Sequence, residues 1–129
     1  MRLSSKSIGS WSIFEVMGTI DSIHTKVFID SLADYIDGGR KNIIMDLTKA
    51  SFLSIGAIRY INQMSQYLSG SGGRLVIMGA NERIKRHIDI FVSWKELREI
   101  NSIWEVIPLQ MEHKFKEAIA EILVEPAIE

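Results

Sequence analysis

Short apolar runs alternate along this chain with segments whose apolar residues recur every three or four positions, and this alternation most restricts its fold. A run such as Asn42–Leu47 is typical of a strand buried on both faces, and a segment such as 28–36 is typical of an amphipathic helix. Strands that alternate with helices favour parallel pairing with right-handed crossover helices. We therefore predict an α/β fold.

The expected order of elements is β-β-α-β-α-β-α-β-α. Strands are predicted at residues 2–8, 11–17, 42–47, 74–79 and 103–107, with a turn at 18–21 and a loop through 49–53. Helices are predicted from about residue 24 to 37, from near 54–56 to the glycines at 70–73, from 82 to 91 after the N-cap Asn81, and from 111 to 123. Residues 92–101 fit either a helix or a loop. The prediction is a mixed, mostly parallel sheet of about five strands packed with about four helices, in a single domain over residues 1–129.

Charge and cysteine content exclude several functional classes. The 129 residues carry 15 Lys+Arg and 16 Asp+Glu, a formal net charge of -1, which argues against direct binding of nucleic acid. The absence of cysteine excludes disulfides and thiolate metal sites. No apolar run has the length of a signal peptide or a membrane span. We expect a cytoplasmic protein that does not bind a membrane.

No motif for catalysis, metal or cofactor binding emerges from the residues. The histidines, His24, His87 and His113, have no partner at a metal-ligand spacing. The glycine-rich segment at 70–74 follows a predicted helix and precedes a strand, the reverse of a phosphate loop, so it is interpreted as a helix end. The basic cluster at 83–87 is interpreted as a solvated helix face. We predict no catalytic residues, no metal and no cofactor.

One segment, residues 43–57, resembles the strand-loop-helix core of the STAS family of sulphate transporters and anti-sigma factor antagonists. The family pattern is an apolar strand, Asp-Leu, a short linker, an apolar pair, and Asp-Ser-Ser/Thr-Gly opening a helix. Gly18-Thr19-Ile20-Asp21 is similar to the upstream Gly-x-Ile/Leu-Asp turn, and residues 72–79 are similar to the strand after the second helix. The resemblance covers about residues 2–123 and implies a STAS-like fold.

The resemblance also implies a regulated docking site. In phosphorylated members, the Ser or Thr just before the glycine is modified by a partner serine kinase. Aligning Gly56 with the family glycine places Ile55 at the acceptor position, Leu53 at the Asp position and Ser54 between them. Ile55 has no hydroxyl, so Ser54 is the substitute acceptor. The alternative is that Ser54 only caps the helix.

The residues expected to bind a partner are Asp21, Leu53, Ser54, Ile55, Gly56 and Ala57. Leu53 and Ile55 form an apolar pair where the family is polar, which fits either a docking patch or packing of helix against sheet. The implied function is a noncatalytic interaction module of bacterial signalling that binds a serine-kinase-type anti-sigma factor and so regulates transcription. The alternatives are an accessory subunit of an ABC transporter or stress-signalling complex, and a small-ligand domain using Asp21, Asp46 and Ser54. Homodimer formation stays open.

Overall fold

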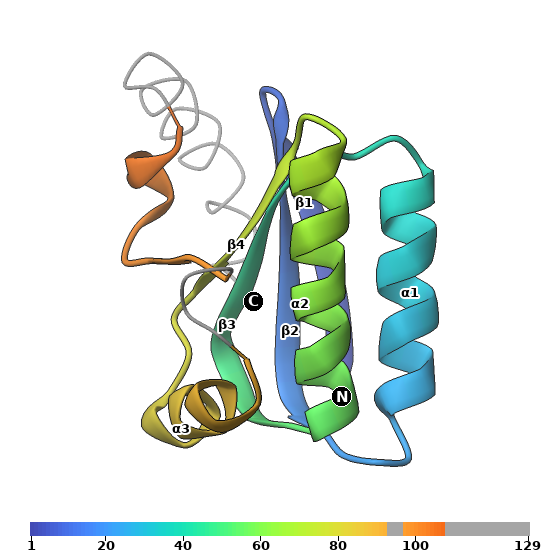
Figure 1. The fold of residues 1–129 in the computed structure, drawn as a ribbon, viewed down its shortest axis with the longest axis vertical. Helices are drawn as coiled ribbons and strands as arrows, with labels where there is room; N and C mark the ends of the chain where they lie inside the picture. The colour runs from blue at the N-terminus through green and yellow to red at the C-terminus, as the bar shows by residue number, and fades with distance from the viewer. Residues whose placement is uncertain (93–96, 108–129) are drawn as a thin grey trace, which may run out of the picture.

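The computed structural model describes residues 1–92 and 97–107, which form one mixed sheet with helices packed on it (Figure 1). The strands are β1 (Arg2–Ile8), β2 (Trp11–Ile20), β3 (Asn42–Leu53), β4 (Arg74–Met78) and β5 (Glu99–Ile100), in the spatial order β1-β2-β3-β4-β5. Only the pairing of β1 with β2 is antiparallel. The helices are α1 (Thr25–Asp37), α2 (Ile55–Gly70) and α3 (Glu82–Phe91), with a 3-10 turn at Ile103–Glu105. The predicted mixed, mostly parallel sheet of five strands is confirmed.

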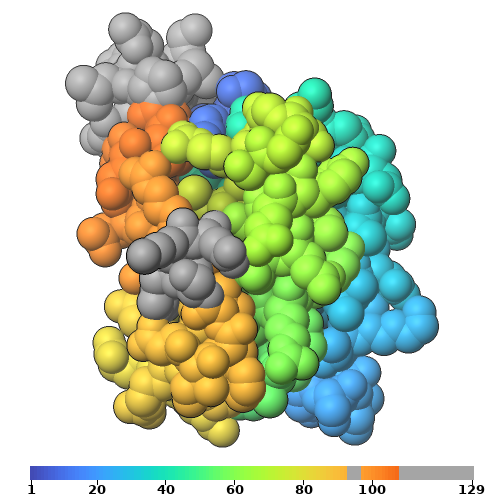
Figure 2. Space-filling view, viewed as in Figure 1, coloured from blue at the N-terminus to red at the C-terminus, as the bar shows by residue number. Residues whose placement is uncertain are grey.

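Three of the four predicted helices are present in the described part of the chain. The fourth, predicted at residues 111–123, lies outside the described residues. Helices α1 and α2 run side by side along the sheet, and α3 lies on the opposite side of α2 from α1 (Figure 1). The surface of α2 therefore lies between those of α1 and α3 (Figure 2).

The central strand β3 is buried on both faces of the sheet. Ile43 and Met45 join the large core cluster beneath the helices, whereas Ile44, between them, joins a second cluster with Ile13 and Val76. Alternate side chains of a strand point to opposite faces, so two cores require an uninterrupted apolar run. This explains why the sequence is apolar at all of positions 43–45.

Both β2 and β3 are longer than predicted. The proposed turn at 18–21 and loop through 49–53 are wrong, because parallel pairing continues until Ile20 lies opposite Leu53. Register shifts between Glu15 and Met17 and between Gly18 and Thr19 interrupt the simple alternation of buried and exposed residues. The polar residues at 48, 49 and 51 therefore suggested a loop in what is an irregular strand.

The predicted strand at residues 103–107 is also wrong. Ser102 and Glu105 form a capping box that begins a 3-10 turn, with the Ser102 hydroxyl accepting from the Trp104 amide. The fifth strand is Glu99–Ile100, within the stretch that the sequence left open. It pairs with Ile77 and Met78 at the edge of the sheet.

Candidate functional site

A broad, open hollow lies where β2 and β3 end and α1 and α2 begin. Its lining comes from three stretches of chain: Asp21, Ser22, Thr25, Phe52, Ser54, Ile55, Gly56 and His87. The last backbone contact between the two strands is the Ser54 amide donating to the Ile20 carbonyl at 2.7 Å. Because the strands are parallel, this contact places the residues that follow Ile20 beside those that follow Leu53.

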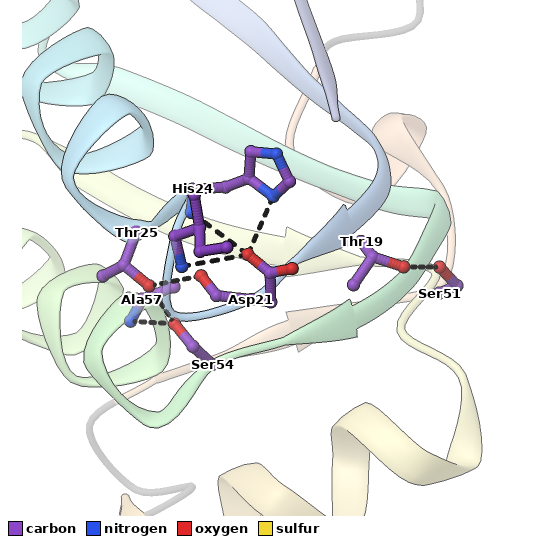
Figure 3. Close-up of polar contacts among 8 residues, drawn as sticks. Thr19, Asp21, His24, Thr25, Ser51, Ser54 and Ala57 are labelled. Atoms are coloured by element: carbon purple, nitrogen blue, oxygen red, sulfur yellow. Dashed lines mark hydrogen bonds and ion pairs between the residues drawn. The ribbon is translucent and has the colours of Figure 1, made fainter.

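Asp21 fixes the turn that precedes α1 (Figure 3). Its carboxylate accepts from the backbone amides of Ile23 at 3.0 Å and His24 at 3.1 Å, and it lies 2.9 Å from His24 Nδ1. The amide of His24, opposed by some desolvation and helped by the nearby imidazole, holds the pKa of Asp21 below its ordinary value. Asp21 is therefore a carboxylate that fixes the geometry of the site.

A directed chain of hydrogen bonds joins α2 to α1 (Figure 3). The Ala57 amide donates to Ser54 Oγ at 3.2 Å, and Thr25 Oγ1 donates to the Asp21 carbonyl at 2.7 Å. Ser54 Oγ and Thr25 Oγ1 are 2.6 Å apart. A hydroxyl has one proton, and that of Thr25 is already donated, so Ser54 must be the donor between them. The order is Ala57 to Ser54 to Thr25 to Asp21, and we call it the hydroxyl relay.

Ser54 is the N-cap of α2, as one of the two interpretations of the sequence predicted. Its backbone is extended, and its side chain accepts from the first turn of the helix. Its hydroxyl hydrogen-bonds to the hydroxyl of Thr25. Within the described residues, neither hydroxyl has a hydrogen bond to an imidazole or carboxylate group that could act as a general base. The relay therefore orders the starts of α1 and α2.

The apolar pair predicted beside Ser54 is split by the fold. Ile55 is 39% exposed and lines the hollow, whereas Leu53 is 0% exposed in the core beneath the helices. Leu53 therefore packs helix against sheet and contributes no side-chain surface to the hollow. Ala57 is likewise buried, and its contribution is the amide that donates to Ser54.

Gly56 lies against the start of α1. A Cβ atom at this position would stand 3.0 Å from the Thr25 methyl group, closer than ordinary van der Waals contact. A larger residue would therefore push on the same side chain that carries the relay. The glycine allows α2 to begin this close to α1.

Sequence reasoning missed four of the lining residues: Ser22, Thr25, Phe52 and His87. Thr25 lies four residues after Asp21, and this spacing is a signal in the sequence that could have indicated a site residue. Its meaning became clear only once the fold placed Ser54 beside Thr25. His87 and Phe52 come from distant segments, and only the packing of α3 beside β3 brings their rings to 5.3 Å.

Asp46, considered as a ligand group, lies outside this hollow. Its carboxylate accepts from the Thr48 amide at 3.0 Å and so shapes the middle of β3. Within residues 1–92 and 97–107, no group of three or more His, Asp or Glu side chains is placed to hold a metal ion. In the same part of the chain, no helix has both the length and the apolarity needed to cross a bilayer.

These features define a class of protein: a small α/β domain with a mixed five-stranded sheet and an open hollow of hydroxyls, one carboxylate and an exposed isoleucine at the strand ends. The chain belongs to the STAS family, since the STAS domain model matches residues 2–100. The family resemblance expected from the sequence is confirmed. The comparison with curated proteins gave no match.

Solved structures with the same fold include anti-sigma factor antagonists. SpoIIAA in its unphosphorylated form is 10% identical, with a TM-score of 0.69 over 84% of this chain and 96% of that one. An anti-sigma factor antagonist from Mycobacterium paratuberculosis is 13% identical, with a TM-score of 0.72 over 81% and 88%. RsbS of Moorella thermoacetica, in a serine-to-glutamate variant, is 12% identical, with a TM-score of 0.65 over 90% and 99%. At these identities the likeness establishes the fold.

Proposed function

We propose that this protein is a noncatalytic interaction module of bacterial signalling that docks a partner protein at the hollow around Ile55. The observation that carries the proposal is an isoleucine 39% exposed at the first position of α2, beside a polar relay that is fully satisfied internally. Contiguous apolar surfaces rimmed by polar groups are typical of protein contacts, and Ile55 lines the hollow together with Phe52. The hollow is also broad and open, whereas small-ligand sites usually enclose their ligand.

The partner we propose is an anti-sigma factor with a serine-kinase fold, so that binding frees a sigma factor and regulates transcription. Support comes from the family and from the anti-sigma factor antagonists that share the fold. An accessory role on an ABC transporter or in a stress-signalling complex is the alternative within the same family. The identity of the bound protein separates these roles.

We further propose Ser54 as the phosphorylation site. Ile55 cannot accept a phosphoryl group, and Ser54 is the lining hydroxyl next to it. Phosphorylation would add about -1.5 to -2 charges and remove the proton that Ser54 donates to Thr25. The relay would then have to rearrange in the middle of the docking surface. Intact-mass analysis of the protein from its native cells tests this, and the absence of a phosphate adduct under all growth conditions would contradict it.

Affinity capture from a lysate of the source organism tests the function. The tagged protein should retain a serine-kinase-fold protein, and Ile55→Asp should lose it. The matched control is Tyr67→Asp, which places the same charge at an exposed aromatic residue near the other end of α2. Capture of an ATPase subunit would favour the transporter role. Equal retention by both variants would move the interface away from Ile55.

The small-ligand alternative has its own test. Metabolites and nucleotides that bind the folded state must raise its unfolding temperature. We expect no such shift, and a shift abolished by Asp21→Asn or Ser54→Ala would favour a ligand site in the hollow.

A further inference from the structure

Beside the hollow, three aromatic rings and two guanidinium groups form a row across β3, α2 and α3. Phe52 and His87 have ring centroids 5.3 Å apart, and His87 and Phe91 have centroids 6.3 Å apart, both in edge-to-face geometry. Arg83 lies over the Phe52 ring, with Cζ 4.6 Å from its centroid, and Arg59 lies over the Phe91 ring at 5.7 Å. We call this set the arginine-aromatic row. Two of its rings, those of Phe52 and His87, line the hollow.

The two arginines are held in place without being neutralised. Both are exposed, and in the described part of the chain no carboxylate lies within ion-pair distance of either one. Lys85, on the same helix as Arg83, has carboxylate partners, because its Nζ lies 3.9 Å from Glu82 Oε1 and 3.7 Å from Glu99 Oε1. Cation–π contact fixes a guanidinium while leaving its N–H donors available to a carboxylate.

The chemistry of the row fits an acidic protein segment. Its middle is aromatic, and the rings of Phe52 and His87 line the hollow together with the exposed Ile55. Ile55 lies four residues before Arg59 and so on the same face of α2. Guanidinium groups stand at both ends of the row. Single-stranded nucleic acid would need open ring faces for stacking, but arginines cover Phe52 and Phe91 and the whole chain has a net charge of -1.

We propose that the arginine-aromatic row, together with Ile55, recognises a partner segment in which apolar side chains are flanked by carboxylates. The proposal rests on the proposed docking function and adds the chemistry of the partner. Arg59 and Arg83 select the acidic groups, and Ile55 with the ring edges of Phe52 and His87 contacts the apolar groups. Electrostatic complementarity of this kind fixes orientation and speeds association.

The test uses two fluorescein-labelled helical peptides, one built from leucine and glutamate and its twin with lysine in place of glutamate. Fluorescence anisotropy should show the acidic peptide binding about tenfold more tightly, with a preference that weakens in high salt. Arg59→Glu/Arg83→Glu should reverse the preference, and Arg59→Lys/Arg83→Lys should keep it. The matched control, Arg2→Glu/Lys6→Glu, makes the same change of net charge on the exposed strand β1 and should leave the preference unchanged.

Equal affinity for the two peptides, or no binding of the acidic one, would overturn the proposal. So would an unchanged preference in Arg59→Glu/Arg83→Glu, or tighter binding of a single-stranded oligonucleotide. Repeating the charge reversal with the partner obtained by affinity capture separates the two levels of the account. If capture depends on Ile55 but not on the arginines, the docking function stands and the proposal of an acidic partner segment is wrong. If capture depends on neither, the docking function itself fails.

Discussion

The hydroxyl oxygens of Thr25 and Ser54 lie 2.6 Å apart, although the two residues are separated by 28 others in the chain. This bond joins the start of α1 to the start of α2 at the place where the parallel strands β2 and β3 end. Because the Thr25 proton goes to the Asp21 carbonyl, the bond has a direction, with Ser54 as its donor. One directed hydrogen bond therefore holds the starts of the two helices together at the hollow.

Removing the Thr25 hydroxyl should destabilise the fold. We expect Thr25→Val, which keeps the branched shape, to lower the free energy of unfolding by about 1 kcal/mol, because Ser54 loses its acceptor and the Asp21 carbonyl loses a donor. The control is Thr19→Val, which breaks the exposed 2.8 Å bond to Ser51 and should change stability by less than about 0.5 kcal/mol. Urea denaturation of both variants measures the difference. Equal effects would show that the relay has no special role.

Ser54 should show two separable roles. Ser54→Ala removes the N-cap and the donor to Thr25 and should cost about 1 kcal/mol. Ser54→Asp keeps an acceptor for the Ala57 amide, so it should be the more stable variant. It also brings negative charge into the hollow and should weaken partner binding. Denaturation and partner affinity are measured on both, and a fully bound Ser54→Asp would contradict control of docking by charge at this position.

Gly56 and Thr25 should be energetically coupled. Alanine at 56 favours the helix, but its Cβ would stand 3.0 Å from the Thr25 methyl group. Thr25→Ser removes that methyl group and keeps the hydroxyl. We therefore expect Gly56→Ala to be more favourable in the Thr25→Ser background than alone, by about 0.5–1 kcal/mol in a double-mutant cycle. Strict additivity would mean that the close approach carries no strain.

Asp21 should make the start of α1 sensitive to acid. Its folded pKa lies below the ordinary 3.8, so its stabilising contribution is complete above that value and is lost as pH falls through the folded pKa. Asp21→Asn should therefore be less stable than the natural protein at neutral pH, with a difference that shrinks in acid. Denaturation across this range, with the Ile23 and His24 amide resonances as local probes, measures it. A difference independent of pH would contradict the role given to the carboxylate.

The sequence predicted the parts of the fold that local patterns determine. The N-caps Ser54 and Asn81, the apolar run 43–45 and the helical spacing in α1–α3 each depend on neighbours close in the chain. The ends of β2 and β3 could not be predicted, because their register shifts depend on pairing between the strands. The strand predicted at 103–107 failed although a capping-box signal, Ser102 with Glu105, was present in the sequence.

The residues of the site could likewise be predicted only in part. The resemblance to the STAS family located Asp21, Ser54, Ile55 and Gly56, and all four line the hollow. Leu53 points inward and Ile55 is exposed because β3 continues to Leu53 before α2 begins. The predicted strand ended at residue 47, so the sequence could not distinguish the two side chains. His87 joins the site through tertiary packing, and no local pattern identifies it. Thr25 has a local signal in its spacing from Asp21, but its role depends on Ser54, which only the fold brings beside it.

The most direct test of the central claim is the dissociation constant of the captured partner protein for three forms of this chain: natural, Ile55→Asp and Tyr67→Asp. The account predicts that Ile55→Asp weakens binding at least about tenfold, because it replaces an apolar side chain of the contact with a hydrated charge, while Tyr67→Asp binds as the natural protein does. Matching denaturation curves for the three forms would show that all are folded. Equal affinity of Ile55→Asp and the natural protein would contradict docking at the start of α2.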